Sequence, residues 1–151
     1  MKSLRNVLLT ALSLFSLLVF TQCSKKDNEL SPKIASLIGN WQLAEPNSSY
    51  EVNLNFTLDE KNPPNDVTPL FGGGRSSVNE YNARFFATVD GMMVVDPIGS
   101  TKVAGEPAAM QFEQTYYTNL RAVVRYELTS DQLKLSYGGD KPGTLVYKRV
   151  K

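Results

Sequence analysis

Side chains that carry chemistry are scarce in this chain of 151 residues. It has no histidine and a single cysteine, Cys23. Without an imidazole or a second thiol, neither a Ser-His-Asp or Cys-His nucleophile nor an imidazole or thiolate metal site can be assembled. We therefore predict no catalytic residue, no metal site and no cofactor, and we expect that the protein is not an enzyme.

Two further patterns were considered for catalysis. The glycine-rich segment Gly72–Ser77 lacks the lysine and the spacing of a phosphate loop, and no Gly-x-Ser-x-Gly elbow occurs. Most candidates for a carboxylate pair fall in expected turns or linkers, where solvated charge is the simpler role. Glu113 lies instead on an expected helix, and we expect it to hydrogen-bond that helix to a sheet. The acids considered are Asp59, Glu60, Asp66, Asp90, Asp96 and Glu113.

The segment before Cys23 has the pattern of a signal peptide. Lys2 and Arg5 precede an apolar run over Val7–Phe20. At ~1.5 Å per residue, a helix over this run would be about 21 Å long, which is too short for the ~30 Å hydrocarbon core of a membrane. We predict a removable signal over residues 1–22.

This signal resembles that of a bacterial lipoprotein, in which the cysteine thiol is acylated and becomes the mature N-terminus. Phe20 and Gln22 depart from the leucine and the small residue usual at their positions. Several acyl chains, at ~0.8 kcal/mol per buried methylene, would anchor Cys23 permanently to a membrane. The alternative is a secreted protein with one free thiol.

Residues 23–33 are polar, charged and without periodicity, so they are predicted to be a flexible tether. The tether resembles the lysine-plus-acid segment that sorts some lipoproteins outward, and no aspartate follows Cys23 directly. We therefore expect a cell-envelope protein, anchored to the outer rather than the inner membrane.

The mature chain is close to neutral and large enough for one domain. Removing residues 1–22 takes away two of the 16 basic residues and none of the 15 acidic ones. This balance provides no basic stripe for nucleic acid, so no nucleic-acid partner is expected. Residues 34–151 suit a single domain stabilised by its core.

Most of this domain alternates apolar and polar residues with the period of a β-strand. Tyr50–Leu58 and Tyr81–Val89 are the clearest runs, and Asp90-Gly91 predicts a hairpin into 92–95. The long section Asp59–Asn79, rich in proline and glycine, is expected to be a mobile excursion. Further strands are expected over Leu37–Leu43, Val124–Leu128, Leu133–Tyr137 and Leu145–Lys148.

One stretch has helical spacing instead. Pro107 to about Leu120 predicts an amphipathic helix. The expected fold is mainly β: a small antiparallel, partly closed β-barrel-like sheet of lipocalin-like topology, with this helix over an opening. Gly39 would permit a tight entry into the first strand, and Trp41 is expected to plug the barrel rather than to stack on a ligand.

Several short motifs occur in a characteristic order across residues 34–151, and together they resemble the META domain, also called the heat-shock HslJ-like domain. This resemblance implies a mainly-β, barrel-like domain of periplasmic and lipid-anchored bacterial proteins, linked with heat or envelope stress and without an established biochemical activity. The motifs are Leu37-x-Gly39-x-Trp41-x-Leu43, Asn79-Glu-Tyr81, Ser100-Thr-Lys-Val-Ala104, Met110-Gln-Phe-Glu113, Tyr126-x-Leu128, Asp131-x-Leu133-x-Leu135 and Leu145-Val-Tyr-Lys148.

The resemblance leaves two functions open. The first is a lipid-anchored, non-enzymatic module that binds an envelope protein or polymer, with a loop over Asn62–Ser77 as its expected surface. The alternative is a lipocalin-like barrel that binds a small ligand at its mouth. Six aromatic residues could line such a mouth, but we expect them to fill the core: Trp41, Phe56, Tyr81, Phe85, Phe112 and Tyr116.

The family pattern has cysteines where this chain has Val78 and Gly105. A lone thiol is a liability in an oxidising compartment, so the loss of both cysteines together implies that they pair in relatives. Paired cysteines need Cα atoms within ~7 Å of each other. We therefore expect Val78 and Gly105 to be in contact.

Overall fold

The computed structural model of the protein describes residues 29–47, 49–62 and 64–151. These residues form one antiparallel sheet of eight strands in the order β5-β4-β3-β2-β1-β8-β7-β6. The predicted signal peptide, Cys23 and most of the predicted tether lie outside the described residues. The elements are α2 (Pro32–Ala35), β1 (Gly39–Glu45), β2 (Asn53–Leu58), β3 (Thr68–Ser76), β4 (Asn79–Ala87), β5 (Met93–Ser100), α3 (Pro107–Arg121), β6 (Val123–Leu128), β7 (Gln132–Tyr137) and β8 (Gly143–Val150).

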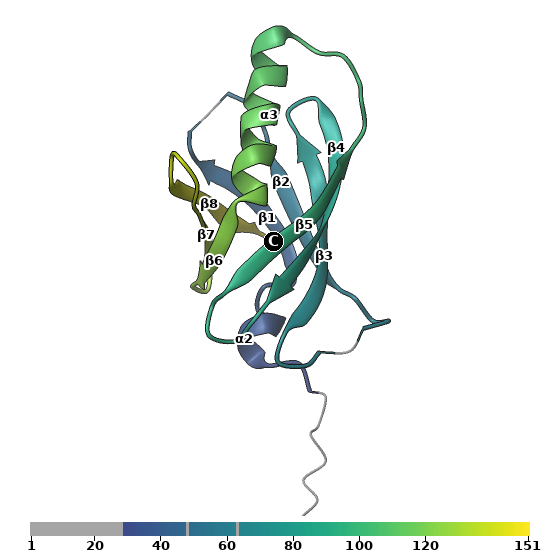
Figure 1. The fold of residues 1–151 in the computed structure, drawn as a ribbon, viewed down its shortest axis with the longest axis vertical. Helices are drawn as coiled ribbons and strands as arrows, with labels where there is room; N and C mark the ends of the chain where they lie inside the picture. The colour runs from purple at the N-terminus through teal and green to yellow at the C-terminus, as the bar shows by residue number, and fades with distance from the viewer. Residues whose placement is uncertain (1–28, 48, 63) are drawn as a thin grey trace, which may run out of the picture.

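The sheet curls into a nearly closed barrel (Figure 1). Each strand pairs with its neighbours in sequence, β8 returns to pair with β1, and α3 joins β5 to β6. The two edges of the sheet meet where the hairpin before β5 contacts β6, through a Met92–Arg125 bridge and through the Tyr126 amide, which donates to the Gly91 carbonyl at 2.8 Å. The predicted mainly-β, partly closed sheet with one amphipathic helix is confirmed. None of the described helices has the length and apolar character of a membrane span.

Large rings fill the inside of the barrel. Trp41 is fully buried, and its indole N–H donates to the Leu37 carbonyl at 2.8 Å, so it contributes to the core and not to a ligand site. Gly39 has a φ of 124°, as the expected tight entry into the first strand requires. Five of the six aromatic residues considered above are buried, and Phe112 packs against their edge as a partly buried side chain.

The prediction of a mobile excursion over Asp59–Asn79 is wrong for its second half, because Thr68–Ser76 form β3, which pairs with both β2 and β4. Its glycines lie inside the sheet because their neighbours occupy the space of a side chain. A Cβ at Gly72 would lie 2.8 Å from Phe85 Cδ2, and one at Gly74 would lie 2.5 Å from the Asn53 carbonyl oxygen. The proposed binding loop over Asn62–Ser77 is therefore wrong for the part that forms β3.

The folded domain also begins earlier than predicted. Leu30 packs against the core, and the Ser31 hydroxyl accepts a hydrogen bond from the Ile34 amide at 3.3 Å, which caps α2. The tether predicted over residues 23–33 is thus shorter, because its last residues belong to the domain.

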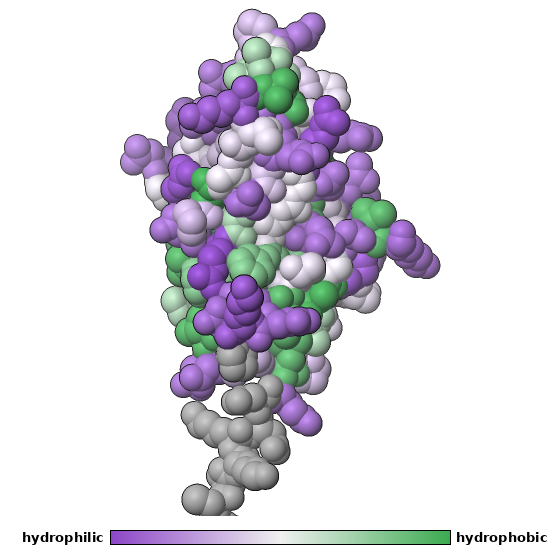
Figure 2. All heavy atoms as spheres, turned by 90° about the vertical axis from the view of Figure 1, so that its right-hand side faces the viewer, coloured by the Kyte–Doolittle hydropathy of each residue, from purple (hydrophilic) through white to green (hydrophobic). Residues whose placement is uncertain are grey.

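In two predicted strands, the alternation of buried and exposed residues does not hold at the end of the strand. Val124 is 51% exposed, because a bulge between Val123 and Arg125 turns Val123 inward in its place. Val89 is 57% exposed, because β4 ends at Ala87 and Val89 belongs to the hairpin. Large apolar side chains of this kind are also exposed elsewhere on the outer face (Figure 2).

The packing of β3 yields a stability prediction. Gly72→Ala places a methyl group against the Phe85 ring, and such overpacking costs about 1–3 kcal/mol. Urea unfolding should show this loss. The matched control is Gly138→Ala, whose added Cβ meets nothing within 4 Å; equal stability of the two variants would contradict the account of β3.

Candidate functional site

The carboxylate of Glu113 joins the helix to the sheet, as predicted. It is 5% exposed and accepts hydrogen bonds from the Asn79 amide at 2.8 Å, the Asn79 side chain at 2.7 Å and the Ser76 hydroxyl at 3.0 Å. The Val78 amide donates a longer bond at 3.3 Å. Because Glu113 and Ser76 are both buried and engaged with each other, their pairing stabilises the fold and does not act on a substrate.

Asn79 extends this network to the segment before α3. Its side-chain oxygen accepts hydrogen bonds from the Thr101 hydroxyl and the Val103 amide, each at 2.7 Å. Its side-chain nitrogen also donates to the Val103 carbonyl at 3.3 Å. One buried amide therefore fixes the β3–β4 turn and residues 101–103 to each other.

Val78 and Gly105 are in contact, which confirms the prediction from the missing cysteines. A Cβ built on Gly105 would lie 3.4 Å from Val78 Cβ and 2.6 Å from Val78 Cγ2. Since each Cα lies one bond of ~1.5 Å from its Cβ, the two Cα atoms are at most ~6.5 Å apart, within the reach of a disulfide. The Val78 side chain thus fills the space beside Gly105.

Three tyrosine hydroxyls form a second buried network inside the barrel. Tyr147 lies 3.0 Å from Tyr116, Tyr116 lies 2.7 Å from Tyr81, and Tyr81 donates to the Asn53 carbonyl at 2.9 Å. Because Tyr81 donates to a carbonyl, Tyr116 donates to Tyr81 and Tyr147 donates to Tyr116, so each proton has an acceptor. Burial raises the pKa of all three phenols. They remain protonated near neutral pH and serve packing rather than acid–base chemistry.

The other carboxylates considered for catalysis are not gathered into a site. Among the described residues, no group of three or more metal-ligating side chains is present. Asp59 accepts hydrogen bonds from Asn62 at 2.8 Å and the Lys61 amide at 3.2 Å, and it pairs with Arg84 at 2.5 Å. Burial alone would raise the pKa of Asp59, but these hydrogen bonds and the Arg84 charge outweigh it and lower the pKa. Asp59 therefore anchors a turn as an ionised group.

The barrel interior offers little room for a ligand. A partly open hollow at the edge of α3, beside Tyr116 and Phe112, measures only about 70 Å³, whereas sites for small organic ligands usually measure at least ~300 Å³. The buried aromatic rings occupy the space that a lipocalin-like ligand would need.

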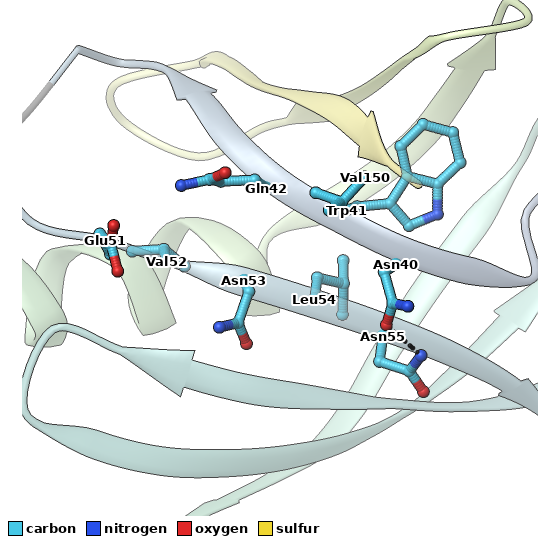
Figure 3. A pocket seen from close by; sticks show the side chains of 9 residues that line it. All are labelled: Asn40, Trp41, Gln42, Glu51, Val52, Asn53, Leu54, Asn55 and Val150. Carbon is cyan, nitrogen blue, oxygen red and sulfur yellow. Dashed lines mark hydrogen bonds between the residues drawn. The ribbon is translucent and has the colours of Figure 1, made fainter.

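Polar side chains that face solvent converge on the outside of β1 and β2. They line an open groove of about 440 Å³, shown in Figure 3. The Asn55 amide nitrogen donates to the Asn40 side-chain oxygen at 2.7 Å, and Asn53 accepts from the Arg75 backbone amide at 2.8 Å. The groove is lined by Asn40, Trp41, Gln42, Glu51, Val52, Asn53, Leu54, Asn55 and Val150.

The strand register continues a row of residues from this groove across the sheet. Asn40 lies opposite Asn55, Asn55 opposite Gly73, Gly73 opposite Asn82, and Asn82 opposite Gly99. We call these five residues the amide row. The two glycines place no side chain of their own between the amides, and the Asn82 side-chain oxygen lies 3.3 Å from where a Cβ of Gly99 would be. Each amide supplies both donors and an acceptor without a charge.

Sequence reasoning did not identify the amide row. The alternation of Tyr50–Leu58 places Asn55 on the exposed face of its strand, which is correct. The alignment of Asn55 with Asn82 depends on the register of β3, and β3 is expected from the sequence to be a loop.

Comparison with known proteins agrees with the fold. Residues 35–150 match the family model described as the META domain. No curated protein matches the chain significantly.

The contact between Val78 and Gly105 predicts a disulfide that can be engineered. In a Cys23→Ser background, Val78→Cys with Gly105→Cys should oxidise spontaneously and raise the unfolding free energy by about 3 kcal/mol, because the bridge closes a loop of intermediate length. Urea unfolding with and without reductant measures the gain, and the two single-cysteine variants are controls. Failure of the pair to oxidise would contradict the described contact.

Proposed function

Because the chain belongs to the META domain family, we propose that it is a non-enzymatic binding module of the cell envelope, held at a membrane by acyl chains on Cys23. The META domain is not a known enzyme family. The lipid anchor is supported by the signal pattern of residues 1–22 and by the single thiol directly after it. The serine after Cys23 favours the outer membrane.

The amide row is the observation that supports binding on the outside of the barrel. Inside, the rings are close-packed, and the buried acids have protein partners. Outside, Asn40, Asn55 and Asn82 present side-chain amides along one row of the sheet. Binding sites combine a hollow with a few converging polar groups, and the groove meets this description.

The chemistry of the row favours an uncharged polymer rich in hydroxyl groups. A hydroxyl both donates and accepts a hydrogen bond, as a side-chain amide does, and the row itself carries no charge. The row crosses five strands, and the four spacings of ~4.8 Å between them give it a length of about 19 Å. This length suits an extended ligand. An extended peptide would instead pair with a free sheet edge, but the edges β5 and β6 are bridged to each other at Met92 and Arg125.

The lipid anchor predicts where the protein is found. In a bacterial host, the full chain should incorporate a labelled fatty acid and sediment with the membranes. Cys23→Ser should lose the label and leave the membrane fraction, because the remaining described residues contain no membrane-spanning helix. A Cys23→Ser protein that still sediments with the membranes would contradict lipid anchoring.

If the amide row binds the polymer, removing two of its side-chain amides should weaken that binding, whereas removing an amide elsewhere should not. Asn55→Ala with Asn82→Ala removes two sets of hydrogen bonds worth ~0.5–1.5 kcal/mol each, so affinity for insoluble peptidoglycan should fall about tenfold in a sedimentation assay. Gln111→Ala removes an exposed amide of α3 and should bind as the parent does. Unchanged sedimentation of the double variant would contradict the site, and crosslinking in intact cells would then identify a protein partner instead.

A further inference from the structure

The outer face of β3–β5 carries apolar side chains in adjoining rows. Pro69 lies opposite Phe86, and Phe86 lies opposite Val94. Phe71 is 45% exposed, Val94 is 56% exposed and Met92 is 51% exposed. Figure 2 looks onto this side of the molecule and shows hydrophobic residues gathered over its lower part. We call this surface the apolar face; it comprises Val67, Phe71, Phe86, Met92 and Val94, with the buried Pro69 beneath it.

One charged group within these rows, the Arg84 guanidinium, is neutralised, and Asp96 is an exposed acid two residues beyond Val94 on β5. The Arg84 guanidinium lies 5.5 Å from the Phe71 ring and 5.4 Å from the Phe86 ring, so it lies between them. It also pairs with Asp59 at 2.5 Å. An ion pair that stacks between two rings adds no net charge to the apolar face.

The apolar face ends at the hairpin that adjoins the start of the domain. Met92 belongs to this hairpin, and the Lys33 ammonium of α2 donates to the Val89 carbonyl at 2.9 Å. Figure 1 shows α2 and the β4–β5 hairpin at one end of the barrel, opposite the segment that joins β5 to α3. The chain therefore enters the domain beside the apolar face.

The length of chain before the domain limits how far this end can lie from a membrane. Leu30 already packs against the core. Seven residue steps separate Cys23 from Leu30, and at ~3.6 Å per residue they span at most about 25 Å. The strands β3 and β4 have nine residues each, so the barrel is about 30 Å long. An anchor on Cys23 thus keeps the hairpin end, and not the opposite end, near the lipid.

We propose that the apolar face rests on the lipid surface to which Cys23 is anchored; this inference rests on the lipid anchor of the proposed function. Once tethered, the face meets lipid at a high effective concentration, so a weak apolar contact suffices to orient the barrel. The partly exposed side chains offer on the order of 400 Å², about half of the ~800 Å² per partner that a stable protein dimer buries. The area therefore favours lipid over a second copy of the chain.

This orientation leaves the β1–β2 part of the amide row accessible, whereas Gly73, Asn82 and Gly99 lie on the same outer face of β3–β5 as the apolar face. The groove is centred on β1 and β2, which follow β3 around the barrel, away from β4 and β5. A lipid surface under the apolar face does not cover Asn40 or Asn55. The proposal therefore assigns different surfaces of one barrel to the membrane and to the polymer.

The test uses the lipidated full chain in vesicles of zwitterionic lipid. The acylated thiol of Cys23 does not react, so Met92→Cys supplies one thiol for an environment-sensitive fluorophore. Val103→Cys is the matched control, because Val103 is 57% exposed and lies in the segment at the opposite end. Lipids with a spin-labelled headgroup should quench the probe at 92 several-fold more than the probe at 103. Adding Val94→Asp should reduce this difference, because it places a charge on the apolar face.

Each outcome decides the proposal. A chain that floats with the vesicles but shows equal quenching at the two sites overturns the orientation and leaves the anchor intact. A chain that does not float overturns the lipid anchor and this proposal with it. A probe at 92 whose emission shifts with protein-to-lipid ratio, without quenching by the lipid, shows that a second copy covers the face and also overturns the proposal.

Discussion

The hydrogen bonds to the Glu113 carboxylate are the constraint on which the rest of the structure depends. A carboxyl group buried between a helix and a sheet loses its hydration, and only strong donors at short distance compensate for that loss. The Asn79 amide and side chain and the Ser76 hydroxyl provide them at 2.7–3.0 Å. Because α3 is the link between β5 and β6, fixing it to the β3–β4 turn also fixes the two strands that complete the barrel.

The filled interior decides where binding can occur. Large rings occupy the inside so fully that β3 must carry glycine wherever Phe85 or Asn53 approaches its backbone. Gly72 and Gly74 meet these two neighbours, whereas Gly73 between them lies opposite Asn55 and Asn82 in the amide row. Adjacent glycines of one run, Gly72–Gly74, thus serve the packing of the barrel and the amide row.

Much of the fold could be predicted from the residues, and the failures have physical causes. The alternation of β2 and the spacing of α3 are visible because one face of each is apolar, and Glu113 was expected to hydrogen-bond the helix to the sheet. Glycines carry no hydropathy signal, so β3 was interpreted as a loop. A bulge turned Val123 inward in place of Val124. The amide row could not be predicted, because it is a property of register between strands and not of any single strand.

Pairing of neighbouring strands has a consequence for how the chain folds. Five strands from β1 to β5 and three from β6 to β8 form from hairpins that are local in sequence, and local contacts form quickly. The seam between β1 and β8 is different, since Asn40 pairs with Val150. A chain that emerges from its N-terminus must hold β1 as an open edge until its last residues arrive. Completion of the barrel is thus the slow step, and until then the exposed edge is the place where the chain is vulnerable to aggregation.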